Sequence, residues 1–159
     1  MSIGKISLML TCVLFLTSCA HISASQQKDM ANFDNVSLIS VYDGDTFYVD
    51  IPSCNIDVFC KHISVRVRGV DCPEMKGGTV ETKARAKQAK EYSERFLKSG
   101  KILLYNCGRD KYFRLLCDVE VNDKSLGAEL IKSGHAVSYD GGTKENSVSL
   151  LNQTHNKLP

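Results

Sequence analysis

The chain has 159 residues, of which 43% are hydrophobic and 24% are charged, and its formal net charge is +2. This composition fits one globular domain with a hydrophobic core. It excludes a protein that binds polyanions through a large overall positive charge, so any nucleic-acid binding must come from a local cluster of residues.

Residues 1–18 are predicted to be an export signal. The apolar run from Ile6 to Leu16 is too short to span a bilayer comfortably, and it ends in Leu16-Thr17-Ser18-Cys19. This ending resembles a bacterial lipoprotein signal, which implies lipidation of Cys19 and attachment to a membrane. An ordinary secretory signal is the alternative, and both interpretations predict export from a bacterial cell. Ala20 favours the outer membrane if the cell has two membranes.

The rest of the chain divides into three predicted parts. Residues 19–35 are polar and predict a flexible tether, residues 36–142 form the predicted domain, and residues 143–159 form a polar tail or a short helix.

Three strands are predicted in the first half of the domain. Val36–Tyr42 and Thr46–Ile51 flank the turn sequence Asp43-Gly44, and Pro52–Lys61 is a predicted loop. The third strand, Ile63–Val70, alternates between apolar and polar residues, which places its arginines on the face opposite the core.

The second half of the domain contains two predicted helices and two more strands. The first helix spans Glu81–Lys98, and strands follow at Ile102–Tyr105 and Leu115–Val121. Ser125 is the N-cap of the second helix, which runs to Ser133. This order predicts an α+β protein that matches a five-stranded oligonucleotide-binding (OB-fold) β-barrel with two to three packed helices.

Seven cysteines are present. Cys12 lies in the signal and Cys19 at the lipid site, so an odd number remain and at least one has no partner within the chain. Export makes disulfides reasonable. Spacing favours the pairs Cys54–Cys60 and Cys107–Cys117, although sequence alone does not determine connectivity. A zinc site ranks below these pairs, because no two cysteines have metal-finger spacing and the four histidines are scattered.

Two carboxylates are candidate metal ligands. Asp45 follows the first turn and Asp71 ends the third strand, so the two can share one cation if the strands are in register. Oxygen ligands suit calcium or magnesium. Cys72 would contribute only its backbone carbonyl oxygen, since thiols are poor ligands for hard cations. Asp43 is interpreted as a turn residue only.

Further residues suggest phosphate chemistry. Glu74 follows Asp71 by three positions and is a candidate general base or positioner of water; the alternative is a surface glutamate. Arg66 and Arg114 can neutralise charge on one phosphate, although structural salt bridges are the alternative for both. Lys111 and Tyr112, next to Arg114, and Tyr139 are candidate substrate-binding residues, the tyrosines through stacking or hydrogen bonding.

The motifs DGDT at Asp43–Thr46, RxRGVDxPE at Arg66–Glu74 and DKYxR at Asp110–Arg114 occur in this order. Together they resemble the thermonuclease, or staphylococcal-nuclease-like, family from about Val36 to Tyr139. The resemblance implies a helix-packed OB-fold barrel and calcium-dependent hydrolysis of DNA and RNA, in which water attacks phosphorus in line and products end in 3′-phosphate.

The resemblance also implies roles for single residues. Asp45 and Asp71 correspond to calcium carboxylates, and Cys72 to a carbonyl ligand. Glu74 corresponds to the residue that activates water. Arg66 and Arg114 correspond to the phosphate-binding arginines, and Tyr112 and Tyr139 to nucleotide-contacting tyrosines. The chain departs from the family at Cys72, often threonine or alanine, and at Phe113, where glycine is usual.

The sequence therefore predicts a monomeric, exported and lipid-anchored nuclease that uses calcium, with no obligate protein partner. One alternative is an OB-fold lipoprotein that binds nucleic acid without catalysis. A structural envelope lipoprotein is a second alternative, and it would need neither the acids nor the arginines.

Overall fold

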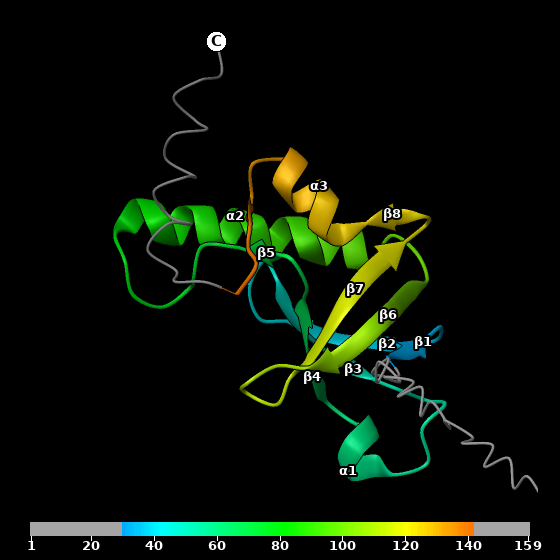
Figure 1. Cartoon of the computed structure of the whole chain (residues 1–159). Coiled ribbons are helices and arrows are strands. Elements are labelled where there is room, and N and C mark those ends of the chain that lie inside the picture. Colours follow the sequence, from blue (N-terminus) through cyan, green and yellow to red (C-terminus); the bar gives the residue numbers. More distant parts are fainter. Residues whose placement is uncertain (1–29, 142–159) are drawn as a thin grey trace, which may run out of the picture.

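The computed structural model describes residues 30–141. Helices α2 and α3 lie over one end of the strands, and α1 lies at the opposite end (Figure 1). The predicted signal of residues 1–18, Cys19, most of the predicted tether and the predicted tail of residues 143–159 lie outside the described residues. Within residues 30–141, no helix is both long enough and apolar enough to cross a membrane.

Nine strands and three helices make up the described part of the chain. In order they are β1 (Ala31–Phe33), β2 (Ser37–Val41), β3 (Thr46–Asp50), α1 (Asp57–Cys60), β4 (Ile63–Val67), β5 (Val70–Asp71), α2 (Val80–Leu97), β6 (Ile102–Arg109), β7 (Leu115–Val121), β8 (Lys124–Ser125), α3 (Leu126–Lys132) and β9 (Val137–Ser138).

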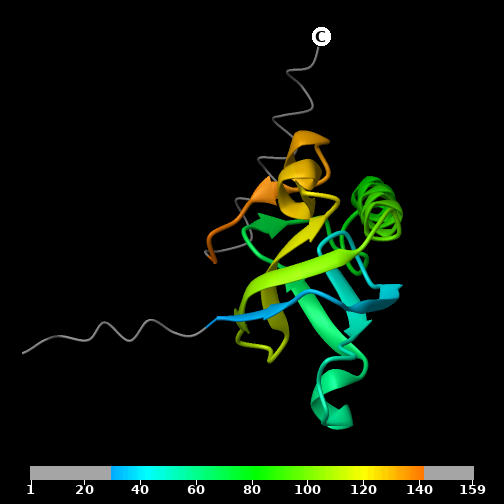
Figure 2. The same ribbon diagram turned by 90° about the vertical axis from the view of Figure 1, so that its right-hand side faces the viewer.

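Seven of the nine described strands form one mixed sheet, and β5 and β9 form a second, two-stranded sheet. The sheet order is β1-β6-β7-β4-β3-β2, with β8 paired to β7, and β4–β7 is the parallel pair in it. The five predicted strands overlap β2, β3, β4, β6 and β7, but the main sheet of the described residues contains seven strands. The short strands β1 and β8 add to these five in the same sheet. The described sheet is open, with β1 and β2 as the edge strands at the two ends of this order. Figure 2 shows the curvature of this sheet beneath α2 and α3.

The third predicted strand is shorter than expected because the chain turns at Gly69. Gly69 has φ +76°, a conformation that favours glycine, and it separates β4 from Val70–Asp71. The latter residues form β5, which pairs with β9 instead of continuing the main sheet. The amide of Tyr139 also donates to the carbonyl oxygen of Gly69 at 2.9 Å. This exchange of partners brings the C-terminal segment beside the end of β4.

The C-terminal end of the predicted tether, residues 19–35, includes a strand of the folded domain. Ala31–Phe33, within the stretch predicted to be flexible, forms β1 and pairs with β6. Phe33 packs against the core as an apolar side chain in a polar segment, which gives this strand a reason to dock. β6 itself extends to Arg109, four residues beyond the predicted end at Tyr105.

Helix α2 packs through small side chains. Thr79 caps it by accepting a hydrogen bond from the Thr82 amide at 3.2 Å. Ala86, Ala89 and Ser93 are buried on one face. These residues recur at three- to four-residue spacing, so the backbone of the helix can approach the strands closely.

Within residues 30–141, two disulfides are present. Cys54 is joined to Cys60 across the α1 loop, and Cys107 to Cys117 across β6 and β7. These are the pairs that the spacing favours. Among the described cysteines, Cys72 carries a free thiol and is buried.

Candidate active site

The turn between β2 and β3 presents Asp45 to the interior. The amide of Asp45 donates to Oδ1 of Asp43 at 3.2 Å, which is an Asx-type turn. Gly44 is essential to the packing here, because a Cβ atom at Gly44 would lie 2.6 Å from Sγ of Cys72 and 2.8 Å from Cβ of Ala89. The turn therefore lies directly against the segment that carries the second acid.

Arg66 lies between the two buried acids. Its Nη1 contacts Oδ1 of Asp45 as an ion pair, and its Nη2 lies 3.1 Å from Oδ1 of Asp71. The three side chains are almost completely buried, at 10% exposure or less. Nη2 also donates to the carbonyl oxygen of Val70 at 3.0 Å. One positive group, the Arg66 guanidinium, thus contacts both carboxylates.

The buried arginine retains hydrogen-bonding capacity. Nη1 of Arg66 makes no hydrogen bond among the described residues, and its contact there is the ion pair with Asp45. Burial lowers the pKa of Arg66, and the charge of Asp71 opposes that shift. Arginine stays charged in proteins. The buried guanidinium thus has anionic partners in Asp45 and Asp71, and anionic oxygens are the acceptors that such a charged donor favours.

Asp45 is also tied to the segment that follows β5. The amide of Cys72 donates to Oδ2 of Asp45 at 2.7 Å, and the hydroxyl of Thr46 donates to Oδ1 at 3.1 Å. Burial raises the pKa of the Cys72 thiol well above its usual range, so the thiol stays protonated. A protonated thiol is a poor ligand for a hard cation, so the backbone oxygen is the group of Cys72 that suits one.

Arg114 is held by Asp110 in the hairpin loop between β6 and β7. Nε of Arg114 donates to Oδ2 of Asp110 at 2.7 Å, and Oδ1 of Asp110 accepts from the amides of Arg114 at 2.9 Å and Tyr112 at 2.8 Å. Nη1 of Arg114 lies 3.5 Å from Oγ1 of Thr46. Because only Nε is used by Asp110, the terminal nitrogens face the turn that carries Asp45.

Asp110 is ionised because of this geometry. Burial of Asp110 favours its neutral form, but hydrogen bonds from the side chain and backbone of Arg114 and from the Tyr112 amide outweigh it and lower the pKa. Asp110 thus acts as a fixed negative group that orients Arg114.

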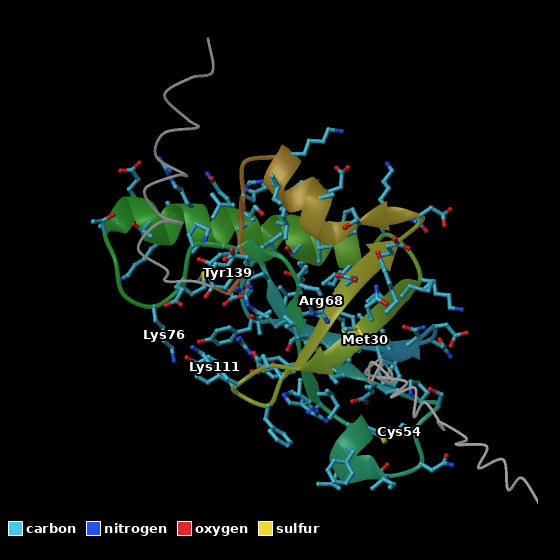
Figure 3. The ribbon with its side chains drawn as sticks, in the orientation of Figure 1. Met30, Cys54, Arg68, Lys76, Lys111 and Tyr139 are labelled. Atoms are coloured by element: carbon cyan, nitrogen blue, oxygen red, sulfur yellow. A yellow bond between two sulfur atoms is a disulfide. The ribbon has the colours of Figure 1, made fainter. Side chains whose placement is uncertain are left out.

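One pocket gathers the predicted site residues. Its lining includes Asp45, Arg66, Asp71, Cys72, Glu74, Lys111, Tyr112, Arg114 and Tyr139. Figure 3 shows Lys111 on the hairpin loop and Tyr139 on the C-terminal segment, on the same side of the sheet. Tyr112 is 68% exposed, and the guanidinium carbon of Arg114 lies 5.5 Å from the centre of its ring. The structure therefore places all nine residues around a single opening.

The three predicted acids do not form one compact metal cluster. Glu74 is exposed, whereas Asp45 and Asp71 are buried. Within residues 30–141, no three His, Cys, Asp or Glu side chains converge as a metal-binding group. The fit to a hard cation rests on the two buried carboxylates, whose oxygen atoms one positive group already bridges. Glu74 contributes to the pocket wall instead of the pair.

Three residues of the pocket region have no predicted site role from sequence alone. Asp43, interpreted as a turn residue, also lines the pocket, and burial raises its pKa. Thr46 lies between Asp45 and Arg114, and Asp110 orients Arg114. The motifs contained all three, but only the packing of separate segments shows what their side chains contact.

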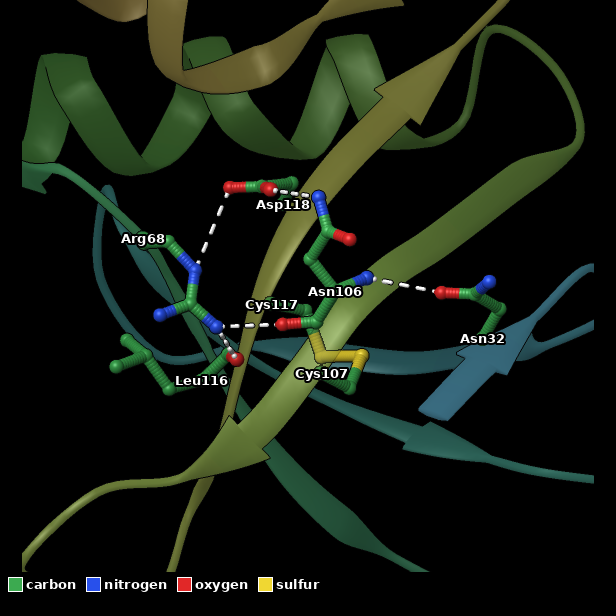
Figure 4. Close-up of a disulfide and its surroundings, with 7 residues drawn as sticks. All are labelled: Asn32, Arg68, Asn106, Cys107, Leu116, Cys117 and Asp118. Carbon is green, nitrogen blue, oxygen red and sulfur yellow. Dashed lines mark hydrogen bonds and ion pairs between the residues drawn. A yellow bond between two sulfur atoms is a disulfide. The ribbon is translucent and has the colours of Figure 1, made fainter. Parts of the chain in front are cut away.

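Arg68, which follows Arg66 by two residues, serves another purpose. Its Nη2 donates to the carbonyl oxygens of Asn106 at 2.5 Å and Leu116 at 2.7 Å, and its Nε lies 3.5 Å from Asp118. Figure 4 shows these contacts beside the Cys107–Cys117 disulfide. The guanidinium of Arg68 is thus committed to joining β4, β6 and β7.

The match to a known family begins at residue 64, so it covers Arg66, Asp71 and Arg114 but not the turn that carries Asp45. A family model described as "Staphylococcal nuclease homologue" matches residues 64–157. "Probable endonuclease LCL3" of Phaeosphaeria nodorum is 33% identical over 95 residues, which cover 57% of this chain and 31% of that protein. "Probable endonuclease lcl3" of Pyrenophora tritici-repentis is 27% identical over 97 residues, covering 58% of this chain and 36% of that protein. The chain thus spans about a third of the length of these curated relatives.

Proposed function

Because this chain belongs to the family of staphylococcal nuclease homologues, we propose that it is a nuclease that hydrolyses phosphodiester bonds of DNA, RNA or both. The observation that carries the proposal is the position of Arg66 between two buried carboxylates in a pocket that Arg114 also lines. The names of the two similar proteins support an endonuclease.

Calcium is the proposed cofactor. Asp45, Asp71 and the backbone carbonyl oxygen of Cys72 would hold the ion, because they offer oxygen atoms and no imidazole or thiolate. When bound, a calcium ion supplies positive charge beside the phosphate and polarises water. The burial of both carboxylates supports this role, because two buried negative charges share the single positive charge of Arg66 and a further cation would balance them.

Glu74 is the proposed general base. Its exposed carboxylate lines the pocket near the buried pair, so it can accept a proton from an attacking water molecule. Attack in line with the leaving 5′-oxygen would leave products with 3′-phosphate ends.

The two arginines would bind the phosphate group. Arg66 offers a buried guanidinium that lies between Asp45 and Asp71, and Arg114 offers the terminal nitrogens that Asp110 does not use. Guanidinium groups fixed in this way stabilise the charge that grows on phosphate oxygens during attack. Lys111, Tyr112 and Tyr139 would contact the nucleotides on either side.

We further propose that the protein is exported, attached to a membrane through a lipid on Cys19, and active as a monomer whose sheet closes as an OB-fold barrel. Two disulfides in one small domain support an oxidising compartment. The apolar run before Cys19 supports an export signal.

One assay distinguishes the nuclease from its alternatives. The full chain is incubated with single-stranded DNA in calcium, in magnesium or with a chelator, and the Glu74→Gln and Arg66→Ala variants are compared with the surface controls Glu91→Gln and Arg95→Ala. We expect calcium-dependent cleavage that both site variants reduce by about 10²- to 10³-fold and the controls retain. Product ends should resist polymerase extension until a phosphatase removes the 3′-phosphate.

Tight binding of DNA without cleavage would contradict the nuclease proposal and support the alternative of a lipoprotein that binds nucleic acid without catalysis. If the wild-type chain neither binds nor cleaves DNA, that result would favour a structural envelope lipoprotein.

A further inference from the structure

A row of polar and aromatic residues leads away from the candidate active site along β3 and β4. In the register of this antiparallel pair, Thr46 lies opposite Arg66 and Tyr48 lies opposite Ser64. Side chains two residues apart on a strand share a face, and they are separated by about 7 Å. Tyr48 and Ser64 are therefore the next pair on the face that carries Thr46 and Arg66.

The pocket follows this row. Tyr48 and Ser64 both line the pocket that contains Arg66 and Arg114. Tyr48 is only partly buried, although the phenylalanine before it on the strand is 1% exposed. Tyr48 thus faces the opening while Phe47 fills the core, which is the alternation expected of a strand with one solvent-facing side.

The ring of Tyr48 is held in place by His62. The two ring centroids lie 4.6 Å apart with an angle of 20° between the ring planes, which is a stacked pair. The amide of His62 donates to Oδ1 of Asp50 at 2.8 Å, and this fixes the backbone beneath the imidazole. His62 is exposed. An aromatic pair held in this way gives a base a flat surface at a small cost in conformational entropy.

At the end of the row away from Arg66, the negative charge of Asp50 has a basic neighbour. Oδ2 of Asp50 lies 3.8 Å from Nζ of Lys61, so its charge is partly offset. A phosphate backbone that passes this end would meet Lys61 and His62 beside the carboxylate. The row is therefore compatible with a polyanion.

We propose that Tyr48 and His62 form a stacking subsite for one base of a single-stranded polynucleotide, next to the phosphate bound by Arg66 and Arg114. This inference rests on the proposed nuclease function. It adds a substrate class, namely single-stranded polynucleotides that extend at least one nucleotide beyond the phosphodiester bond that is cleaved. Every base has a π face, so the subsite tolerates any base.

The test compares short single-stranded oligonucleotides of increasing length as substrates of the full chain. Stacking of one base predicts that Tyr48→Leu raises KM by about 5- to 140-fold for long substrates. The increase should be absent for the shortest substrate and reach a plateau once the subsite is filled. Tyr48→Phe should behave as the wild type, because it keeps the ring, and His62→Ala should show a smaller increase of the same form.

A half-buried tyrosine outside the pocket provides the control. Tyr105 on β6 donates a hydrogen bond to Glu120, and Tyr105→Leu removes a ring of the same size without touching the pocket. A merely structural role of Tyr48 predicts that Tyr48→Leu changes KM equally at every length. That result, or an unchanged KM at every length, would overturn the subsite.

Failure of the nuclease proposal is a separate outcome. If the wild-type chain cleaves none of the oligonucleotides, the same length series is measured as Kd by fluorescence anisotropy. A length-dependent loss of affinity in Tyr48→Leu would then support the subsite in a binding protein. Equal Kd values for wild type and Tyr48→Leu would reject it.

Discussion

The hydroxyl of Ser93 on α2 donates a hydrogen bond to the backbone carbonyl oxygen of Gly44 at 2.5 Å. Ser93 is 1% exposed, so the bond is shielded from water. It fastens the long helix to the turn that presents Asp45. The candidate site thus depends on α2, although no α2 residue lines the pocket.

Replacing Ser93 by alanine should destabilise the protein. The carbonyl oxygen of Gly44 would lose a buried partner, at a cost of about 1–3 kcal/mol in the free energy of unfolding. Ser99→Ala is the matched control, because the Ser99 hydroxyl donates to the carbonyl oxygen of Phe96 at an exposed position. Urea unfolding of the two variants measures the difference, and equal losses would show that the Ser93 bond adds nothing specific.

Adding a single methyl group at Gly44 should disturb the site directly. Its Cβ would meet Sγ of Cys72 at 2.6 Å, so the turn or its neighbour must move. We expect Gly44→Ala to lower the free energy of unfolding by about 1–3 kcal/mol and to reduce cleavage. A Cβ at Gly108 would meet nothing within 4 Å, which makes Gly108→Ala the control. Full activity of Gly44→Ala would contradict the close packing of this turn.

Asp110→Asn should weaken the orientation of Arg114. The asparagine keeps the shape of the side chain but loses the charge that attracts Nε, and displaced catalytic groups lose up to about 100-fold in rate. The pKa of Asp110 is lowered in the folded protein, so its ionised form stabilises the fold above the unfolded pKa of 3.8. This contribution is lost as the pH falls through the lower folded pKa.

The stability advantage of the wild type over Asp110→Asn should therefore be complete at neutral pH and decline only below pH 3.8. Urea titrations across this range measure it. A constant difference at all these pH values would mean that Asp110 does not owe its effect to its charge.

Phe113 occupies a strained position in the hairpin loop. Its φ is +70°, and its side chain is 75% exposed. A residue with a Cβ atom in this region costs about 1–2 kcal/mol, which glycine avoids. Phe113→Gly should thus be more stable than Phe113→Ala by about 1 kcal/mol in thermal unfolding, since both lose the ring and only alanine keeps the strain. Greater stability of the alanine variant would contradict this reasoning.

Much of the fold follows from local sequence. The strand Leu115–Val121 has the predicted bounds, and α2 and α3 differ from prediction by one residue at their ends. Ser125 caps α3 as expected, by accepting from the Ala128 amide. These elements were predictable because alternation, helix composition and capping are properties of neighbouring residues.

Other features depend on contacts between distant segments. β1 consists of Ala31–Phe33, and it is a strand only because β6 offers an edge. β5 and β9 are two-residue strands that stabilise each other. The pairing of Arg66 with both acids, and the place of Thr46 beside Arg114, required the register of β3 with β4 and the position of the hairpin loop. Spacing alone cannot supply these relationships.

The most direct test of the central claim is the rate of single-stranded DNA cleavage as a function of calcium concentration, for wild type and Asp71→Asn. Asp57→Asn, at the exposed first residue of α1, is the control. We predict that the wild type and the control saturate with calcium, and that Asp71→Asn needs at least about tenfold more calcium or loses cleavage. Full wild-type cleavage in the presence of a chelator, or overlapping calcium curves for wild type and Asp71→Asn, would contradict a cation held by the Asp45–Asp71 pair.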